Sequence, residues 1–68
     1  MSLSYDKLWK LLIDNHIKRK ELREMIEVSS STMARLSKNQ TVSLEVLMKI
    51  CKVLRCDIGD IIEITDEE

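Results

Sequence analysis

The chain has 68 residues, enough for one small domain but too few for a deep catalytic cleft on a separate scaffold. It contains no proline, no phenylalanine and one glycine, a composition that favours helices and argues against a turn-rich all-β fold. The net charge is −1, but the last six residues carry four of the twelve acidic side chains, so the remainder has eleven basic and eight acidic residues, or +3. This balance is compatible with phosphate binding and equally with a solvated helix face.

The first predicted helix runs from residue 4 to about residue 15. Ser4 is placed to cap it, and Asp6 suits the positive end of the helix dipole. Residues 1–3 are assigned to no element. His16 falls in the turn that follows. Apolar residues recur at helical spacing, which predicts a buried face. This face consists of Tyr5, Leu8, Trp9, Leu11, Leu12 and Ile13.

The second predicted helix spans about residues 18–26. Its apolar side consists of Leu22, Met25 and Ile26. No Ser, Thr, Asp or Asn stands directly before it, so its start is poorly capped. The charge of Glu21 near the amino end partly compensates for the missing cap.

The third predicted helix begins in the stretch VSSSTMARLSKNQ, residues 28–40. Ser29 is a good N-cap, and Met33 and Leu36 recur as an inward-facing pair. The other side of this helix carries Ser30, Ser31 and Ala34, which therefore face broadly outward together. The triple serine is the first turn of a helix, and Asn39, which tolerates a left-handed conformation, suits its end.

The fourth predicted helix spans about residues 44–54, with Ser43 as its cap and Val42 and Leu47 in the two positions of a hydrophobic staple. It is expected to be the most buried helix. Its wide apolar face consists of Leu44, Leu47, Met48, Ile50, Cys51 and Leu54.

A fifth predicted helix starts at Asp57, with Asp60 three residues later. Its inward residues are expected to be Ile58, Ile61 and Ile62. Residues 61–65 are β-branched apart from position 63, so this stretch is either the end of the helix or a short extended strand.

Cofactor, metal and membrane functions find little support in the sequence. Two cysteines and one histidine cannot supply the four ligands of a structural zinc site. Cys51 is expected in the core, no disulfide is expected between Cys51 and Cys56, and free thiols indicate a reducing cytoplasm. No apolar run approaches the roughly 20 residues of a membrane span. Neither a nucleophile beside His16 nor a phosphate-cradling glycine loop is present, so we expect no enzyme, no cofactor and no small-molecule ligand.

About three residues join the second and third predicted helices, the spacing of a helix-turn-helix, whose second helix enters the DNA major groove. KRKELREMIEVSSSTMARLSKNQTVSLEVLMKICKVLRCDIGDII, residues 18–62, resembles the Cro/repressor-type (XRE-like) helix-turn-helix regulators, and the resemblance extends over roughly residues 5–64. It implies an all-α, compact five-helix bundle of the lambda-repressor-like DNA-binding type. Residues 1–68 would form this single domain, with an acidic tail, 63–68, that is flexible or a short strand.

Four positions depart from the family pattern. Arg23 stands where a small residue is usual, and Arg19 replaces the common glutamine at the start of the second helix. Ser37 stands where an acidic residue often follows the recognition helix. Glu27 replaces the turn glycine, and a non-glycine residue there would be strained if it kept a positive φ.

The resemblance also implies a role for individual residues in double-stranded DNA binding. The base-contacting positions are Ser30, Ser31 and Arg35. The phosphate-contacting positions are Arg19, Ser29, Lys38, Asn39 and Gln40. Lys18 and Lys20, from the basic cluster at the start of the second helix rather than from the resemblance, are expected either to contact phosphate as well or to be solvated surface charges. Serine hydroxyls discriminate bases weakly, whereas arginine can contact guanine through two hydrogen bonds, so direct readout should be modest and phosphate contacts should dominate affinity.

These residues predict a cytoplasmic, sequence-specific DNA-binding transcriptional regulator that acts on an operator as a homodimer. The alternative is an antitoxin-like or accessory protein-interaction module with the same fold. Trp9 is expected in the core or at a subunit contact. The candidate dimer surface is Ile61, Ile62 and Ile64 with Trp9 or Ile13, although these residues could instead close the core.

Overall fold

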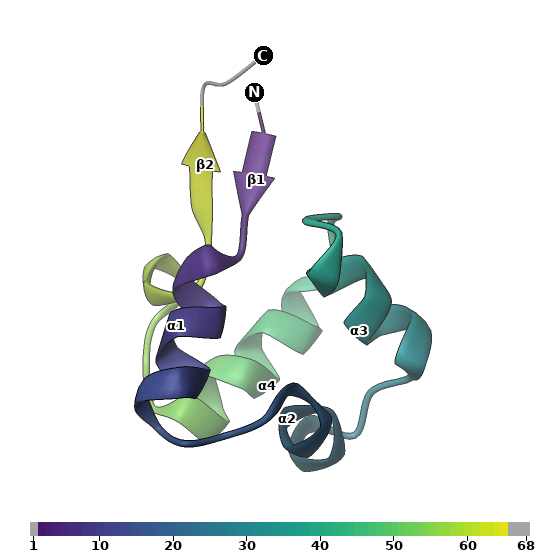
Figure 1. The fold of residues 1–68 in the computed structure, drawn as a ribbon. Coiled ribbons are helices and arrows are strands. Elements are labelled where there is room, and N and C mark those ends of the chain that lie inside the picture. The colour runs from purple at the N-terminus through teal and green to yellow at the C-terminus, as the bar shows by residue number, and fades with distance from the viewer. Residues whose placement is uncertain (1, 66–68) are drawn as a thin grey trace.

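The computed structural model describes residues 2–65, which form four α-helices, one short 3₁₀ helix and two strands. Figure 1 shows the helices packed around a common centre, with the two strands projecting from one end. No helix among these residues is long and apolar enough to cross a bilayer. In chain order the elements are β1 (Ser2–Ser4), α1 (Asp6–Asp14), α2 (Arg19–Ile26), α3 (Ser30–Ser37), α4 (Leu44–Leu54), η1 (Ile58–Asp60) and β2 (Glu63–Thr65).

The predicted fifth helix is wrong, because the chain makes only one 3₁₀ turn, η1, before it becomes extended. The Asp57 N–H donates to Asp60 Oδ2 at 2.9 Å, which caps this turn. Residues 63–65 then pair antiparallel with residues 2–4, with Leu3 opposite Ile64. Within residues 61–65, for which a helix end or a strand was left open, residues 63–65 form a strand and residues 61–62 connect it to η1. Residues 66–68 of the acidic tail lie outside the described part.

The core lies between the four α-helices, and it also includes Ile61. On α3 the predicted inward pair, Met33 and Leu36, is buried. The predicted apolar faces of the other helices are too wide, because a helix at the surface of a small domain buries only a stripe. Only Leu47 and Ile50 of α4 are buried, which corrects its expected rank as the most buried helix. Five residues predicted to face inward are exposed: Ile13, Met25, Leu44, Met48 and Ile58.

Serine side chains begin two of the helices as predicted. Ser29 Oγ accepts from the Thr32 N–H at 3.2 Å, and Ser43 Oγ accepts from the Val46 N–H at 3.2 Å. Ser4 is displaced from its predicted cap position, because α1 begins at Asp6; its Oγ still accepts from the Asp6 N–H at 3.1 Å. The start of α2 has no serine cap, but the Lys18 N–H donates to Glu21 Oε1 at 2.8 Å.

All four α-helices end on a non-glycine residue in the left-handed conformation. These residues are His16, Glu27, Asn39 and Arg55, with φ between 56° and 58°. The next residue then donates its N–H back across the helix end, as in a Schellman motif. The four bonds are Ile17 to Leu12 at 2.9 Å, Val28 to Arg23 at 3.4 Å, Gln40 to Arg35 at 2.8 Å and Cys56 to Cys51 at 3.0 Å.

Candidate nucleic-acid interface

A three-residue turn connects α2 to α3 and fixes their relative orientation. Glu27 has φ 56° and ψ 51°, so the turn keeps the left-handed conformation although its glycine is missing. Val28 is half-buried against the core, and Ser29 caps α3. Arg23, which stands where the family has a small residue, is accommodated by pointing outward, and its Nε lies 3.4 Å from the Val28 carbonyl oxygen. The turn is therefore built from larger side chains than usual without losing its geometry.

The outer side of α3 is exposed at the three predicted base-contacting residues, Ser30, Ser31 and Arg35, and at Ala34, which was predicted to face outward. Ser29 Oγ lies 2.8 Å from Ser31 Oγ, so these two hydroxyls orient each other at the start of the helix. The Ser30 hydroxyl has no hydrogen-bond partner within residues 2–65. Small side chains at these positions leave room for the helix backbone to approach a groove floor closely.

Arg35 spans from α3 to the loop that precedes α4. Its Nε donates to the Thr41 carbonyl oxygen at 2.8 Å, and Nη2 lies 3.5 Å from Thr41 Oγ1. The guanidinium therefore holds residues 38–43 against α3 in the free protein. It must release Thr41, or use its remaining N–H groups, to reach a base edge.

Arg19 connects three helices at the amino end of α2. Its guanidinium carbon lies 3.7 Å from the centroid of the Trp9 ring on α1, and Nη1 donates to Ser37 Oγ at 3.2 Å. Stacking of a cation on an indole face orients the guanidinium at little entropic cost. Trp9, expected in the core or at a subunit contact, is thus half-buried beneath Arg19. The sequence contains no sign that Arg19 stacks on Trp9, because this contact joins two different helices.

A shallow groove of about 240 Å³ runs between α2 and the outer side of α3. Three cations line it from α2, and two serines, one alanine and the largely buried Met33 line it from α3. Residues 18–40 contain six basic and three acidic side chains, so this region has a net charge of +3 within a chain of net charge −1. The groove is lined by Arg19, Lys20, Arg23, Ser30, Met33, Ala34 and Ser37.

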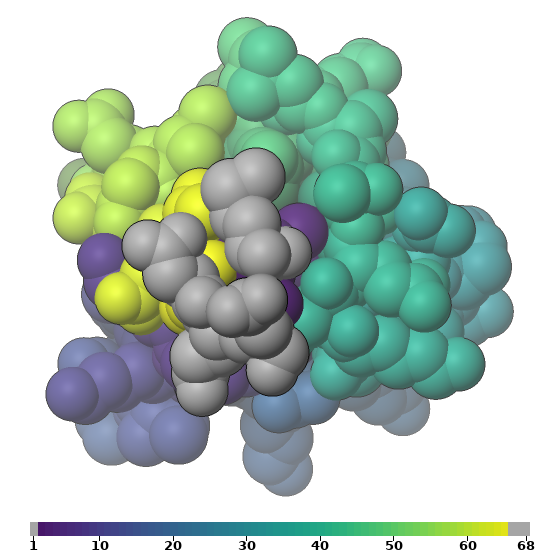
Figure 2. Space-filling view, turned by 90° about the horizontal axis from the view of Figure 1, so that it is seen from above, coloured from purple at the N-terminus to yellow at the C-terminus, as the bar shows by residue number. Residues whose placement is uncertain are grey.

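Tyr5, which directly precedes α1, anchors the loop after α3. Its backbone N–H donates to Asn39 Oδ1 at 3.1 Å, and its hydroxyl donates to the Gln40 carbonyl oxygen at 2.7 Å. Burial raises the pKa of the Tyr5 hydroxyl, and the Arg35 charge partly opposes this rise. Figure 2 shows this end of the molecule, with the loop beside the paired strands.

The two predicted phosphate-contacting residues Asn39 and Gln40 therefore also have a structural role. Lys38, in the same loop, is exposed, as are Lys18 and Lys20 at the start of α2. The anchoring by Tyr5 was missed from the sequence, where this residue counted only as apolar. Its hydroxyl was the available signal, because a buried tyrosine hydroxyl usually finds an acceptor.

Comparison with known proteins agrees with this geometry. The model of the Cro/C1-type HTH DNA-binding domain matches residues 7–67. The chain therefore belongs to the family of Cro/C1-type helix-turn-helix DNA-binding domains.

A crystal structure of the transcriptional regulator VanUg is similar to the chain over nearly its whole length. The two share 59% sequence identity and superimpose with a TM-score of 0.93, over 97% of this chain and 88% of VanUg. No curated protein shows significant sequence similarity to the chain.

Proposed function

We propose that the protein is a sequence-specific transcriptional regulator that binds double-stranded DNA as a homodimer and reads the major groove with α3. The observation that carries the proposal is the exposed outer side of α3, where small and hydroxyl side chains lie beside the cations of α2 and next to Lys38. Family membership and the similarity to VanUg support it.

Phosphate contacts beside α3 would supply most of the affinity. Lys18, Arg19 and Lys20 lie at the amino end of α2, where Arg19 reaches Ser37 in the last turn of α3, and Lys38 follows directly after α3. Backbone N–H groups at the start of α2 and α3 add donors for phosphate oxygens. Such contacts set the register of the protein on the duplex but carry little sequence information.

Base recognition would then fall to Ser30 and Ser31, with Arg35 at the next turn of α3. A serine hydroxyl can donate to or accept from any base pair, so each serine contributes weak discrimination. Arg35 can contribute more through two hydrogen bonds to guanine, once it exchanges Thr41 for a base. We therefore expect a short recognition sequence in each half-site.

Two copies would double this short recognition sequence. Helix-turn-helix dimers bind half-sites about 34 Å apart, one helical turn of DNA. The described chain measures 33 × 24 × 18 Å, so two copies side by side can place their α3 helices at about this separation.

The test is selection of duplexes from a random pool, followed by titration of the selected and a scrambled duplex. Ser31→Ala and Arg35→Ala should change the preferred bases at single positions, because these side chains would contact base edges. Lys38→Ala should weaken binding to all sequences alike, whereas Lys10→Ala, which removes an exposed cation of α1, should have little effect. Failure to enrich any sequence, or equal binding of the selected and the scrambled duplex, would refute the proposal and favour a protein-interaction module.

A further inference from the structure

An exposed apolar strip runs along the outer side of α4 and continues onto η1. Leu44 and Met48 are separated by one helical turn, and their exposed fractions are 60% and 59%. Cys51, one turn further, is half-buried, and Ile58 on η1 is 38% exposed. These residues lie outside the groove between α2 and α3, so DNA binding does not account for them. We call this strip the α4–η1 face.

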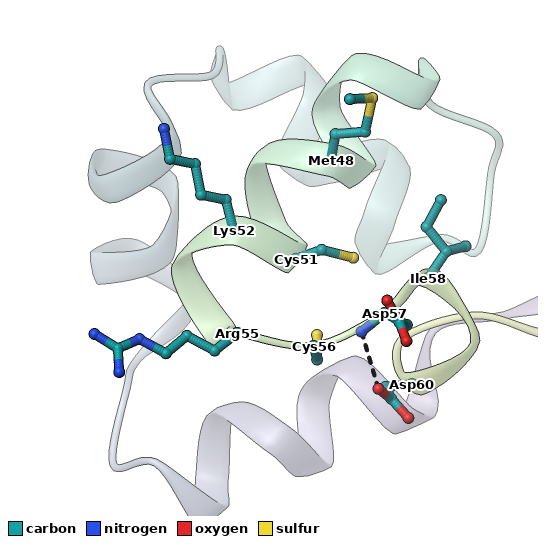
Figure 3. Close-up of a pocket in the computed structure, with 8 residues that line it drawn as sticks. All are labelled: Met48, Cys51, Lys52, Arg55, Cys56, Asp57, Ile58 and Asp60. Carbon is teal, nitrogen blue, oxygen red and sulfur yellow. Dashed lines mark hydrogen bonds between the residues drawn. The ribbon is translucent and has the colours of Figure 1, made fainter.

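A hollow of about 720 Å³ lies within the α4–η1 face, and opposite charges border it. Figure 3 shows Lys52 and Arg55 on one side of the hollow and Asp57 and Asp60 on the other. Cys51 and Cys56 lie between the two charged sides and bring their thiols together across the end of α4. The face is thus apolar in the middle, basic at one side and acidic at the other.

This charge arrangement is self-complementary. A two-fold axis brings the same surface of two copies together in opposite directions, so the basic side of one copy meets the acidic side of the other. The apolar middle, with Met48 and Ile58, would then be covered by the same residues of the partner. A partner surface with only one sign of charge would be repelled by whichever side of the face carries the same sign.

We propose that the α4–η1 face is the surface through which two copies of the chain associate. This inference rests on the dimer of the proposed function and specifies where that dimer forms. An α-helix of 11 residues is about 16 Å long, so the face is smaller than the roughly 800 Å² per partner of a standard interface. Association in free solution is therefore weak, and two adjacent half-sites on DNA strengthen it by holding the copies together.

The dimer surface expected from the sequence does not form one continuous face. Ile61 is fully buried and closes the core. Ile13 and Ile64 are exposed, but Ile13 lies in the last turn of α1, whereas Ile64 belongs to the strand pair next to the first turn of α1. The α4–η1 face brings its exposed apolar residues together on adjoining elements.

The first test compares two methionines in sedimentation equilibrium over a concentration series. Met48→Glu buries a charge in the proposed contact and should weaken self-association about tenfold or more. Met25→Glu is the matched control, because Met25 is similarly exposed, at 49%, but lies on α2. The inference is overturned if the wild-type protein is monomeric at all concentrations and also binds the full operator without cooperativity. Equal weakening by both variants would overturn it too.

A second test exchanges charges between copies. Lys52→Glu and Asp57→Lys each place like charges opposite one another in a two-fold dimer, so each variant alone should associate more weakly than the wild type. An equimolar mixture of the two variants restores both attractive pairs and should associate more strongly than either alone. A mixture that associates no better than its components would contradict the proposed pairing.

DNA binding by Met48→Glu separates this inference from the proposed function. The variant should bind a duplex with one half-site as tightly as the wild type does, but it should lose cooperative binding to two half-sites. If the wild type and Met48→Glu both fail to bind DNA, but Met48→Glu still weakens self-association, the proposed function fails and the interface stands. If both proteins bind two half-sites with equal cooperativity, the interface fails and DNA recognition stands.

Discussion

Glu27 carries the backbone strain of the helix-turn-helix. Its left-handed conformation is unfavourable for a residue with a Cβ by roughly 1–2 kcal/mol, and its carboxylate lies at the negative end of α2. The same conformation recurs at His16, Asn39 and Arg55, and of these residues asparagine and histidine are the types commonly found in it. Packing on both sides of the turn, including that of Val28, therefore holds Glu27 in place.

Glu27→Gly should raise the free energy of unfolding by about 0.5–1 kcal/mol, because relief of strain exceeds the added entropy of the unfolded chain. Urea denaturation measures the change. Glu24→Gly, an exposed position inside α2, should lower the same quantity by a similar amount. Glu27→Gln separates the carboxylate charge from the backbone effect. A loss of stability in Glu27→Gly would show that the turn is not strained.

The thiol of Cys56 links stability to pH. Burial raises its pKa from 9.0 to about 11, and the neighbouring Cys51 thiol and the Asp60 and Asp57 carboxylates add to this rise. The unfolded chain loses this proton first as the pH rises. The contribution of the buried, protonated thiol to the free energy of unfolding is therefore complete below pH 9 and is lost as the pH rises towards about 11.

The expected result is a difference in unfolding free energy between the wild type and Cys56→Ala that is constant from pH 7 to 8 and shrinks between pH 9 and 11. Denaturation at a series of pH values measures it. Comparing the two proteins cancels the titration of other groups, including Tyr5. A difference that stays constant up to pH 11 would contradict the raised pKa.

At the scale of elements, the strand pair and the loop after α3 act as one unit. Tyr5 connects them, since it follows β1 directly and bonds to Asn39 and Gln40. Arg35 holds the same loop from α3. The position of Lys38 therefore depends on residues more than 30 positions away in the chain.

Tyr5→Phe should lower the free energy of unfolding by about 1 kcal/mol, because the Gln40 carbonyl loses its donor. It should also weaken DNA binding to all sequences alike, because the loop is released while α3 keeps its base-facing side chains. Thr65→Val is the control, since it deletes a hydroxyl that donates to the Ser2 carbonyl oxygen at 3.4 Å, away from the loop. Altered base preference in Tyr5→Phe would contradict this account.

Local signals sufficed to predict the four α-helices, but not the 3₁₀ turn or the strand pair. The caps Ser29 and Ser43 and the inward pair Met33 and Leu36 depend on neighbours within one or two turns, and the structure confirms them. Pairing of Ser2–Ser4 with Glu63–Thr65 joins the two ends of the chain, which no local periodicity reveals.

The candidate site divides in the same way. The outward side of α3 follows from helical spacing and was predicted. The hydrogen bonds of Arg35 with Thr41, and the stacking of Arg19 on Trp9, depend on tertiary proximity and were not. Residues that the family pattern associates with DNA thus have structural partners in the free protein.

At the scale of the molecule, charge is distributed unevenly over a nearly neutral chain. The region from residue 18 to residue 40 is net positive, whereas the acidic side chains concentrate near the carboxyl end. A duplex approaching α3 would meet the cations of α2 beside this helix and Lys38 directly after it, and the release of counterions from its phosphates would favour binding. The second copy, through the α4–η1 face, would repeat this arrangement one helical turn away.

The salt dependence of binding to the selected duplex tests the central claim most directly. We predict that log K falls linearly with log salt, with a slope of several units, because each neutralised phosphate contributes about 0.9. Lys38→Ala should reduce the slope by about one unit per bound copy, and Lys10→Ala should leave it unchanged. A flat salt dependence, or equal slopes for the wild type and Lys38→Ala, would contradict the placement of α3 and its flanking cations against DNA.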